Sequence, residues 1–140
     1  MATYDTTNDS DRAVKEYVDL DLFFGRKSSN SDVQDLTNIK AVKRSVRNLI
    51  LTNFGEKPFH PEIGSGVRDM LFENMTPITA IILSRKIEDV INNFEPRVNL
   101  VGVRAQPDLD RNLYEVSIEF YVVNQPTELQ DLSVMLEVLR

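Results

Sequence analysis

The stretch LYEVSIEFYVV, residues 113–123, alternates apolar and polar side chains along its length. Successive side chains of a β-strand point to opposite faces, so this alternation predicts a strand with one buried and one solvated face. The apolar set is Tyr114, Val116, Ile118, Phe120 and Val122. This is the clearest strand signal in the chain, and it makes a β-sheet the centre of the expected fold.

The sequence before this strand predicts its partner. Val101, Val103 and Ala105 alternate with polar or small residues, and a turn rich in Asp and Asn follows at residues 108–112. Two alternating runs separated by a short turn are typical of an antiparallel hairpin, here over about residues 98–123.

The C-terminal residues fit two structures. A strand is indicated by Leu132, Val134, Leu136 and Val138, whereas a helix is indicated by Leu129, Leu132, Leu136 and Leu139. We favour a third strand beside the hairpin, because the two-residue period continues the pattern of the preceding sequence.

Two main helices are predicted before the hairpin. The first begins after a cap at Thr37 or Asn38 and ends near residues 52–55, since side-chain oxygens of this kind accept from free backbone N–H groups. Its apolar face is Ile39, Val42, Val46, Leu49 and Ile50. The pattern predicts that this face packs on the sheet.

The second main helix begins at Thr76 and Pro77, a capping hydroxyl followed by proline at the first helical position. It runs to about residue 93 and is stopped by Pro96. Its apolar stripe is Ala80, Leu83, Ile87, Val90, Ile91 and Phe94, widened by Ile78, Ile81 and Ile82. A stripe this wide predicts a well-buried helix.

The remaining segments are shorter. Residues 1–16 begin with a polar run and predict a flexible N-terminal tail. Residues 17–24 alternate, so that Val18, Leu20, Leu22 and Phe24 predict an extended segment packing one apolar edge on the domain. A shaped loop rich in Pro and Gly is expected at 55–66, followed by one or two helical turns at 67–72.

Together these elements predict an α+β fold in one small domain, residues 17–140, with two main helices packed on a small, mostly antiparallel sheet. The length of 140 residues and the hydrophobic share of 41% suit a single domain with a real core.

Composition excludes several classes of function. The chain has no cysteine, which excludes disulfides and sulfur-based zinc sites. The formal net charge is −6, a poor basis for binding nucleic acid, which needs concentrated Lys and Arg. No apolar run approaches the roughly 20 residues of a membrane span. We therefore expect neither nucleic acid nor a membrane nor a small-molecule substrate as partner.

The sequence carries no specific catalytic motif, and we expect no catalytic residue, metal or cofactor. His60 is the only histidine, and it cannot assemble a His-based metal site by itself. With 22 acidic residues, some pair always meets the separation that glycosidases need, so the count decides nothing. Residues 64–66, Gly-Ser-Gly, lack the rest of a phosphate loop and predict a turn into the next helix.

Three candidate interaction sites stand out. A basic stripe, Lys40, Lys43, Arg44 and Arg47, is either a solvated helix face or a docking face for an acidic protein. The cluster Glu95, Pro96 and Arg97 is either a local ion pair at a corner or a rigid presentation of Arg97 to a partner. The third is the predicted strand itself as an open sheet edge: Leu113, Tyr114, Glu115, Val116, Ser117, Ile118, Glu119, Phe120 and Tyr121.

An ordered set of short motifs resembles a known family. DLDLFF (19–24), the helix at 39–51, TNFGEKPFHPEIG (52–64), LFENMTP (71–77) and NFEPR (93–97) follow one another as in the gp25-like baseplate wedge proteins of contractile phage tails. The resemblance covers roughly residues 17–125. Related proteins occur in type VI secretion and other contractile injection machines.

This resemblance implies a sheath initiator in the virion tail baseplate, assembled in the host cytoplasm and arranged with six-fold symmetry. Its implied partners are the wedge proteins, the tail sheath subunit and, as further candidates, tube or tube-initiator proteins. The family's Glu-Pro-Arg cluster, matched by Glu95, Pro96 and Arg97, contacts the helical core bundle of the wedge. The edge near residues 113–123 is implied to exchange strands with the first sheath ring.

Three rival functions remain. A small cell-wall hydrolase would need a cleft with two carboxyl groups of different pKa, and no motif supports it. A regulatory adaptor would bind one protein through the basic helix and give the sheet edge no role. A component of a non-phage contractile machine would share the baseplate role.

Overall fold

The computed structural model describes residues 17–27 and 32–138. The chain divides into two units, Met1–Ala41 and Val42–Arg140, and each is described by itself. The predicted tail, residues 1–16, lies outside the described residues. The division into a tail and a domain at 17–140 therefore stays a prediction, whereas the mixed α+β class is confirmed.

The first unit contains a small antiparallel ribbon. Strand β1 (Val18–Leu20) pairs with β2 (Asp35–Thr37), and Lys27 forms an ion pair with Asp35 at 2.9 Å. The predicted extended segment is present, but its predicted burial is wrong. Large exposed side chains are Val18, Leu20, Leu22, Phe23 and Phe24.

The reason is local. The strand lasts only three residues, and the chain then turns, so an alternating face cannot continue to Phe24, whose φ is 54°. Asp21 is the buried residue of this segment, and its Oδ1 accepts a hydrogen bond from the Phe23 amide at 3.1 Å. An Asp that bonds the backbone two residues on is a turn former.

Helix α1 (Asn38–Leu51) begins in the first unit and continues into the second. Val42, Val46 and Ile50 are fully buried, as the apolar spacing predicts. The loop after it leads through Gly66, which has a φ of 57°, into the short helix α2 (Val67–Met70). The predicted turn at residues 64–66 is therefore confirmed.

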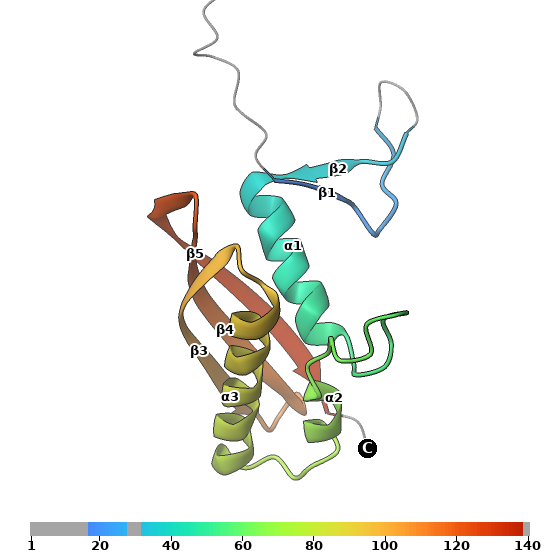
Figure 1. Cartoon of the computed structure of the whole chain (residues 1–140). Coiled ribbons are helices and arrows are strands. Elements are labelled where there is room, and N and C mark those ends of the chain that lie inside the picture. The colour runs from blue at the N-terminus through green and yellow to red at the C-terminus, as the bar shows by residue number, and fades with distance from the viewer. Residues whose placement is uncertain (1–16, 28–31, 139–140) are drawn as a thin grey trace, which may run out of the picture. The chain divides into compact units, whose positions relative to one another are not determined.

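Helix α3 (Pro77–Phe94) begins as predicted, with the Thr76 hydroxyl accepting from the Thr79 amide at 3.1 Å. Its buried stripe is Ala80, Leu83, Ile87, Val90 and Ile91. The predicted widening of that stripe is wrong, because Ile78, Ile81 and Ile82 are exposed. The helix packs one face on the sheet, against β3, and none of the described strands or main helices packs on its opposite face (Figure 1).

The sheet has the order β3–β4–β5, formed by β3 (Val98–Asp108), β4 (Leu113–Val122) and β5 (Gln125–Glu137), all antiparallel. The predicted hairpin and C-terminal strand are confirmed, and the helical alternative for the C-terminus is wrong. On β4 the predicted apolar set, from Tyr114 to Val122, is buried.

The predicted edge is wrong. Residues 113–121 lie in β4, which is hydrogen-bonded to β3 on one side and to β5 on the other. Its backbone groups are therefore already used within the sheet, and it cannot accept a further strand. The prediction failed because the C-terminal strand, β5, pairs with β4. The strand with the clearest sequence signal is therefore the central strand of the sheet.

Candidate functional site

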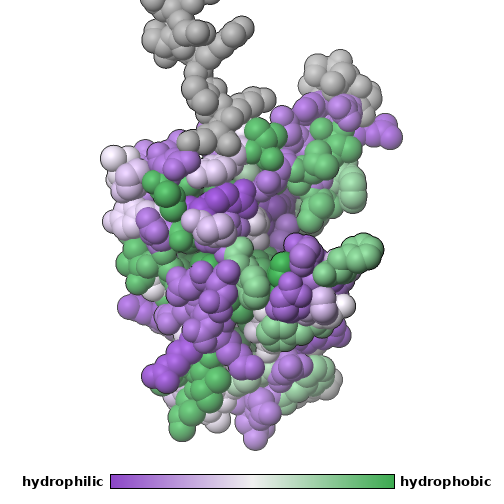
Figure 2. Space-filling view, in the orientation of Figure 1, coloured by the Kyte–Doolittle hydropathy of each residue, from purple (hydrophilic) through white to green (hydrophobic). Residues whose placement is uncertain are grey.

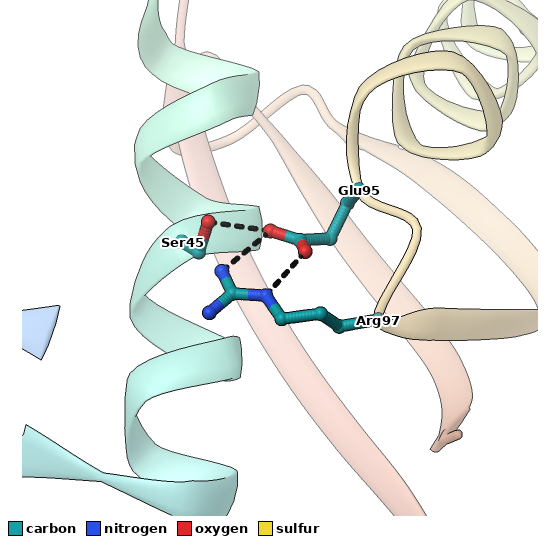
Figure 3. A network of polar contacts seen from close by, with 3 residues as sticks. All are labelled: Ser45, Glu95 and Arg97. Atoms are coloured by element: carbon teal, nitrogen blue, oxygen red, sulfur yellow. Dashed lines mark hydrogen bonds and ion pairs between the residues drawn. The ribbon is translucent and has the colours of Figure 1, made fainter. Parts of the chain in front are cut away.

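The cluster predicted at Glu95, Pro96 and Arg97 forms the corner between α3 and β3 (Figure 3). The Glu95 carboxylate accepts hydrogen bonds from Arg97 Nε at 2.7 Å and Arg97 Nη2 at 3.0 Å. A third comes from Ser45 Oγ of α1 at 2.5 Å. Two side chains, Ser45 from α1 and Arg97 from the α3–β3 corner, thus meet at one carboxylate.

Burial and hydrogen bonding act in opposite directions on Glu95, whose side chain is only 4% exposed. Burial raises the pKa of a carboxyl group, but the bonds from Arg97 and Ser45 and the charge of Arg97 outweigh it. The net result is a Glu95 pKa below its ordinary value of 4.5. The carboxylate is therefore charged near neutral pH and holds Arg97, which is 25% exposed, in one orientation.

Backbone bonds fix this corner to the sheet. The Val98 amide donates to the Glu95 carbonyl at 3.2 Å, and the Val123 amide donates to the Arg97 carbonyl at 3.0 Å. Pro96 is exposed between them. The structure thus brings the three predicted residues together, and it adds Ser45, which sequence reasoning missed because nothing in the sequence pairs positions 50 apart.

The basic stripe lies on α1, as predicted. Lys40 and Arg47 are exposed, whereas Lys43 and Arg44 are half-buried. The choice between a solvated face and a docking face stays open.

The solvated face of the sheet carries an open groove of about 350 Å³. Glu115, Glu119 and Asp131 line it together with Arg104. Glu119 and Asp131 are directly opposite each other on β4 and β5. Like charges directly opposite each other disfavour the pairing of two strands. Because the three acids outnumber Arg104, this face of the sheet carries a net negative charge.

The loop between α1 and α2 carries a feature that sequence reasoning missed. Phe59 is 96% exposed, with a left-handed φ of 66°, and its neighbour His60 contacts Glu62 at 3.1 Å. His60 thus forms a hydrogen bond within the loop. The available signal for Phe59 was a phenylalanine set between two prolines, Pro58 and Pro61, in a loop that cannot bury it.

The described residues show neither a metal-binding cluster nor a membrane-spanning helix. Across residues 17–27 and 32–138, no group of three or more His, Cys, Asp or Glu side chains is arranged to hold a metal ion. No helix in that part of the chain is long and apolar enough to cross a membrane.

Comparison with known proteins gives two consistent findings in sequence. The family model described as "Baseplate wedge protein gp25" matches residues 37–127. The baseplate wedge protein gp25 of Enterobacteria phage T4 is 35% identical over 122 residues, which covers 87% of this chain and 92% of the phage protein.

Solved structures with the same fold come from several machines. A chain of the anti-feeding prophage baseplate, solved with six-fold symmetry, has a TM-score of 0.62 at 22% identity and covers 89% of this chain and 87% of its own. A chain of the type VI secretion baseplate complex has a TM-score of 0.60 at 21% identity and covers 71% and 92%.

A third structure, from Geobacter sulfurreducens, is described provisionally as a tail lysozyme. It has a TM-score of 0.65 at 23% identity and covers 71% of this chain and 89% of its own. At these identities the solved structures show a shared fold, and the lysozyme description applies to that protein alone.

Proposed function

This chain belongs to the gp25 family of baseplate wedge proteins, and from that premise we propose that it joins the wedge of a contractile tail to the sheath and starts sheath assembly. A structural role in the baseplate follows from the family. The contacts with sheath and wedge are the proposal, and they are argued below from the sheet edge and from the Glu95–Arg97 corner.

The sheet has two outer strands, and β3 is closed to a further strand. The Ala105 amide points away from β4 and donates to Ser84 Oγ of α3 at 3.0 Å. In an antiparallel pair, outward amides recur every second residue, so the next outward position is Pro107, which has no N–H. A bound side chain and a proline block this edge.

The β5 edge is open, because its outward backbone groups are not paired with another described strand. The Val138 amide donates to the Asn112 carbonyl at 3.1 Å, so even-numbered residues of β5 turn their backbone groups toward β4. Backbone groups that turn outward then belong to Asp131, Ser133, Met135 and Glu137. Among the described residues β5 pairs with β4 alone. This open edge is the observation that carries the proposal.

Strand addition suits a templating role. Each backbone hydrogen bond contributes only about 0.5–1.5 kcal/mol net, but a strand of this length forms several at once. Six copies in a ring would present six such edges together, and multivalency would raise the affinity for a preassembled sheath ring far above that of one copy. The six-fold ring is part of the proposal and is supported by the symmetry of the anti-feeding prophage baseplate.

The wedge contact is proposed at Glu95, Pro96 and Arg97. The buried Glu95 fixes the guanidinium, and Pro96 is exposed beside it, so a helical bundle can approach a preformed polar corner. The basic stripe on α1 is proposed as a second contact for an acidic neighbour. Contacts with tube or tube-initiator proteins, and assembly in the host cytoplasm, belong to the same proposal.

The decisive experiment is reconstitution. The purified chain is mixed with its cognate sheath subunit and wedge proteins, and the products are imaged by electron microscopy. We expect sheath to grow only from complexes that contain this chain. Sheath that grows equally well without it would overturn the initiator role.

Two rivals are tested alongside. A cell-wall hydrolase would clear a suspension of cell walls in a turbidity assay, and we expect no clearing by this chain. An adaptor would form a one-to-one complex that is insensitive to changes in β5.

A further inference from the structure

A pocket of about 310 Å³ lies at the open edge of β5. Its β5 residues are Leu136 and Glu137, and the other residues that line it come from α1, α2 and the segments adjoining them. Among the described residues none from β4 lines it, so the pocket is on the side of β5 that faces away from β4. A strand added to β5 would lie about 4.8 Å from it and would therefore pass this pocket.

The wall of the pocket is apolar. Ile50 of α1, Val67 of α2 and Leu136 of β5 are almost fully buried, whereas Leu51 is 49% exposed and can be reached by a bound group. Figure 2 shows hydrophobic side chains at the surface on the side where Figure 1 places α2 and the end of α1. An apolar cavity of roughly 150 Å³ already admits a benzene ring, so this pocket can hold one large apolar side chain.

The alternation of β5 decides which side chain of an added strand would enter the pocket. Val134 and Leu136 are buried on the core face, whereas Ser133, Met135 and Glu137 are exposed on the solvated face. Directly opposed residues of two paired strands have their side chains on the same face of the sheet. The residue opposite Leu136 would therefore point into the pocket, and its sequence neighbour opposite Glu137 would lie on the solvated face.

The charges along β5 indicate which side chains an added strand would carry on the solvated face. Asp131 and Glu137 are exposed there, and the groove that Asp131 lines is acidic. The other two charges at the pocket, Glu56 and Arg68, are of opposite sign and offset each other. Opposite charges across a strand pair stabilise it and like charges destabilise it, so Lys or Arg is favoured opposite Glu137 and Asp131.

We propose that the β5 edge and this pocket form one binding site for an extended segment of the sheath subunit. The segment places a large apolar side chain in the pocket, opposite Leu136, and carries Lys or Arg at the adjoining position, opposite Glu137. A second basic residue further along the segment meets Asp131. The inference rests on the proposed sheath contact, and it adds the chemistry that the incoming strand must carry.

The combination of features restricts the occupant. The free backbone groups of β5 pair only with an extended chain, because a helix has already satisfied its own N–H and C=O groups. In strand addition the backbone bonds supply affinity, and pockets for alternate side chains supply specificity. The pocket at Leu136 and the carboxylate of Glu137 are such a pair of selective positions on neighbouring residues.

The first test measures binding of the full chain to its purified cognate sheath subunit. Leu51→Glu places a charge at the pocket and is expected to weaken binding at least about 10-fold, since an unpaired charge is costly to bury. The matched control is Ile81→Glu, a helical residue of similar exposure, 55%, that lines neither the pocket nor the edge, and it should change binding less than 2-fold. Glu137→Lys is expected to weaken binding about 5-fold, and Glu137→Asp to preserve it.

The second test identifies the occupant directly. The chain has no cysteine, so Leu51→Cys carries a single photo-crosslinker at the pocket. We expect it to capture a segment of the sheath subunit in which Lys or Arg adjoins a large apolar residue, as identified by mass spectrometry. The same label at Ile81→Cys should not capture this segment.

Several results would overturn the inference while the sheath contact stands. One is sheath binding that Ser133→Pro abolishes but that Leu51→Glu or Glu137→Lys leaves within 2-fold of the unchanged chain. Another is capture of a sheath segment without such a pair of residues, and a third is capture of a second copy of this chain. If the unchanged chain does not bind the sheath subunit at all, the proposed function itself is wrong, and this site with it.

Discussion

The Glu95 carboxylate and the Arg97 guanidinium are joined by two hydrogen bonds, of 2.7 and 3.0 Å, across an exposed proline. Of the two side chains, the acid is buried and the base reaches the surface. The pair thus has a structural side, facing Ser45 on α1, and a side that a partner can reach. The two roles can be separated by experiment.

Replacing Arg97 is expected to affect both stability and docking. In Arg97→Ala the buried Glu95 carboxylate loses the guanidinium and keeps its bonds to Ser45 and to the backbone of residue 97. Removing one partner of a mostly buried charge pair lowers the free energy of unfolding by about 1–3 kcal/mol. Chemical denaturation measures this change. Glu95→Gln with Arg97→Ala is the control, and it should recover part of the loss because no uncompensated charge remains. An unchanged denaturation midpoint in Arg97→Ala would mean that the pair is not structural.

Stability should depend on pH through Glu95. Its pKa in the folded protein lies below the ordinary value of 4.5, so the folded state binds this proton less readily than the unfolded state. The contribution of Glu95 is therefore complete above about pH 5 and declines as the pH falls through its folded pKa. Denaturation between pH 6 and 3 should show a smaller decline for Glu95→Gln than for the unchanged chain. Equal declines would show that other carboxyl groups account for the effect.

The open edge can be closed without breaking the sheet. Ser133 is exposed, and its amide turns away from β4, so Ser133→Pro removes a donor that pairs with no strand among the described residues. We expect the variant to fold and to incorporate sheath subunits at least about 10-fold less well in reconstitution. Ser133→Ala is the control for the lost hydroxyl. Val134→Pro, by contrast, should unfold the strand because its amide faces β4. Normal sheath growth from Ser133→Pro would exclude β5 as the template.

Two glycines provide a matched test of the loop. A Cβ on Gly64 would lie 2.5 Å from the Phe54 amide nitrogen, whereas a Cβ on Gly102 would meet no atom within 4 Å. Gly64→Ala is therefore expected to lower the free energy of unfolding by about 1–3 kcal/mol, since overpacking forces the backbone to move. Gly102→Ala should change it by less than about 0.5 kcal/mol. Thermal unfolding followed by circular dichroism compares the stability of the two variants. Equal effects would show that the loop moves to accept the Cβ of residue 64 without loss of stability.

Local signals predicted the elements well. Thr76 and Pro77 set the start of α3, and the alternation from Tyr114 to Val122 set β4, because capping and period are properties of neighbouring residues. The order of strands is not such a property. Nothing within residues 113–121 shows that β5 will cover the side of β4 that faces away from β3.

Which apolar side chains are covered was predicted less well, for the same reason. The spacing of Ile78, Ile81 and Ile82 is compatible with burial, but α3 has one packing face in this chain, and that face is taken by Ala80, Leu83 and Ile87. Hydrophobic period gives the direction in which a side chain points. It does not say whether another element of the chain covers that side chain.

The hydrogen bond from the Ala105 amide to Ser84 Oγ also bears on how many strands each copy can bind and in which direction a row of strands can grow. With β3 blocked by Ser84 of α3 and by Pro107, the three-stranded sheet of the described residues would, under the proposed function, offer the β5 edge and no second edge from which to continue. Such a subunit can end a row of paired strands but cannot extend one, so it would not polymerise with itself edge to edge. Growth from it would run in one direction only, with one incoming strand for each copy.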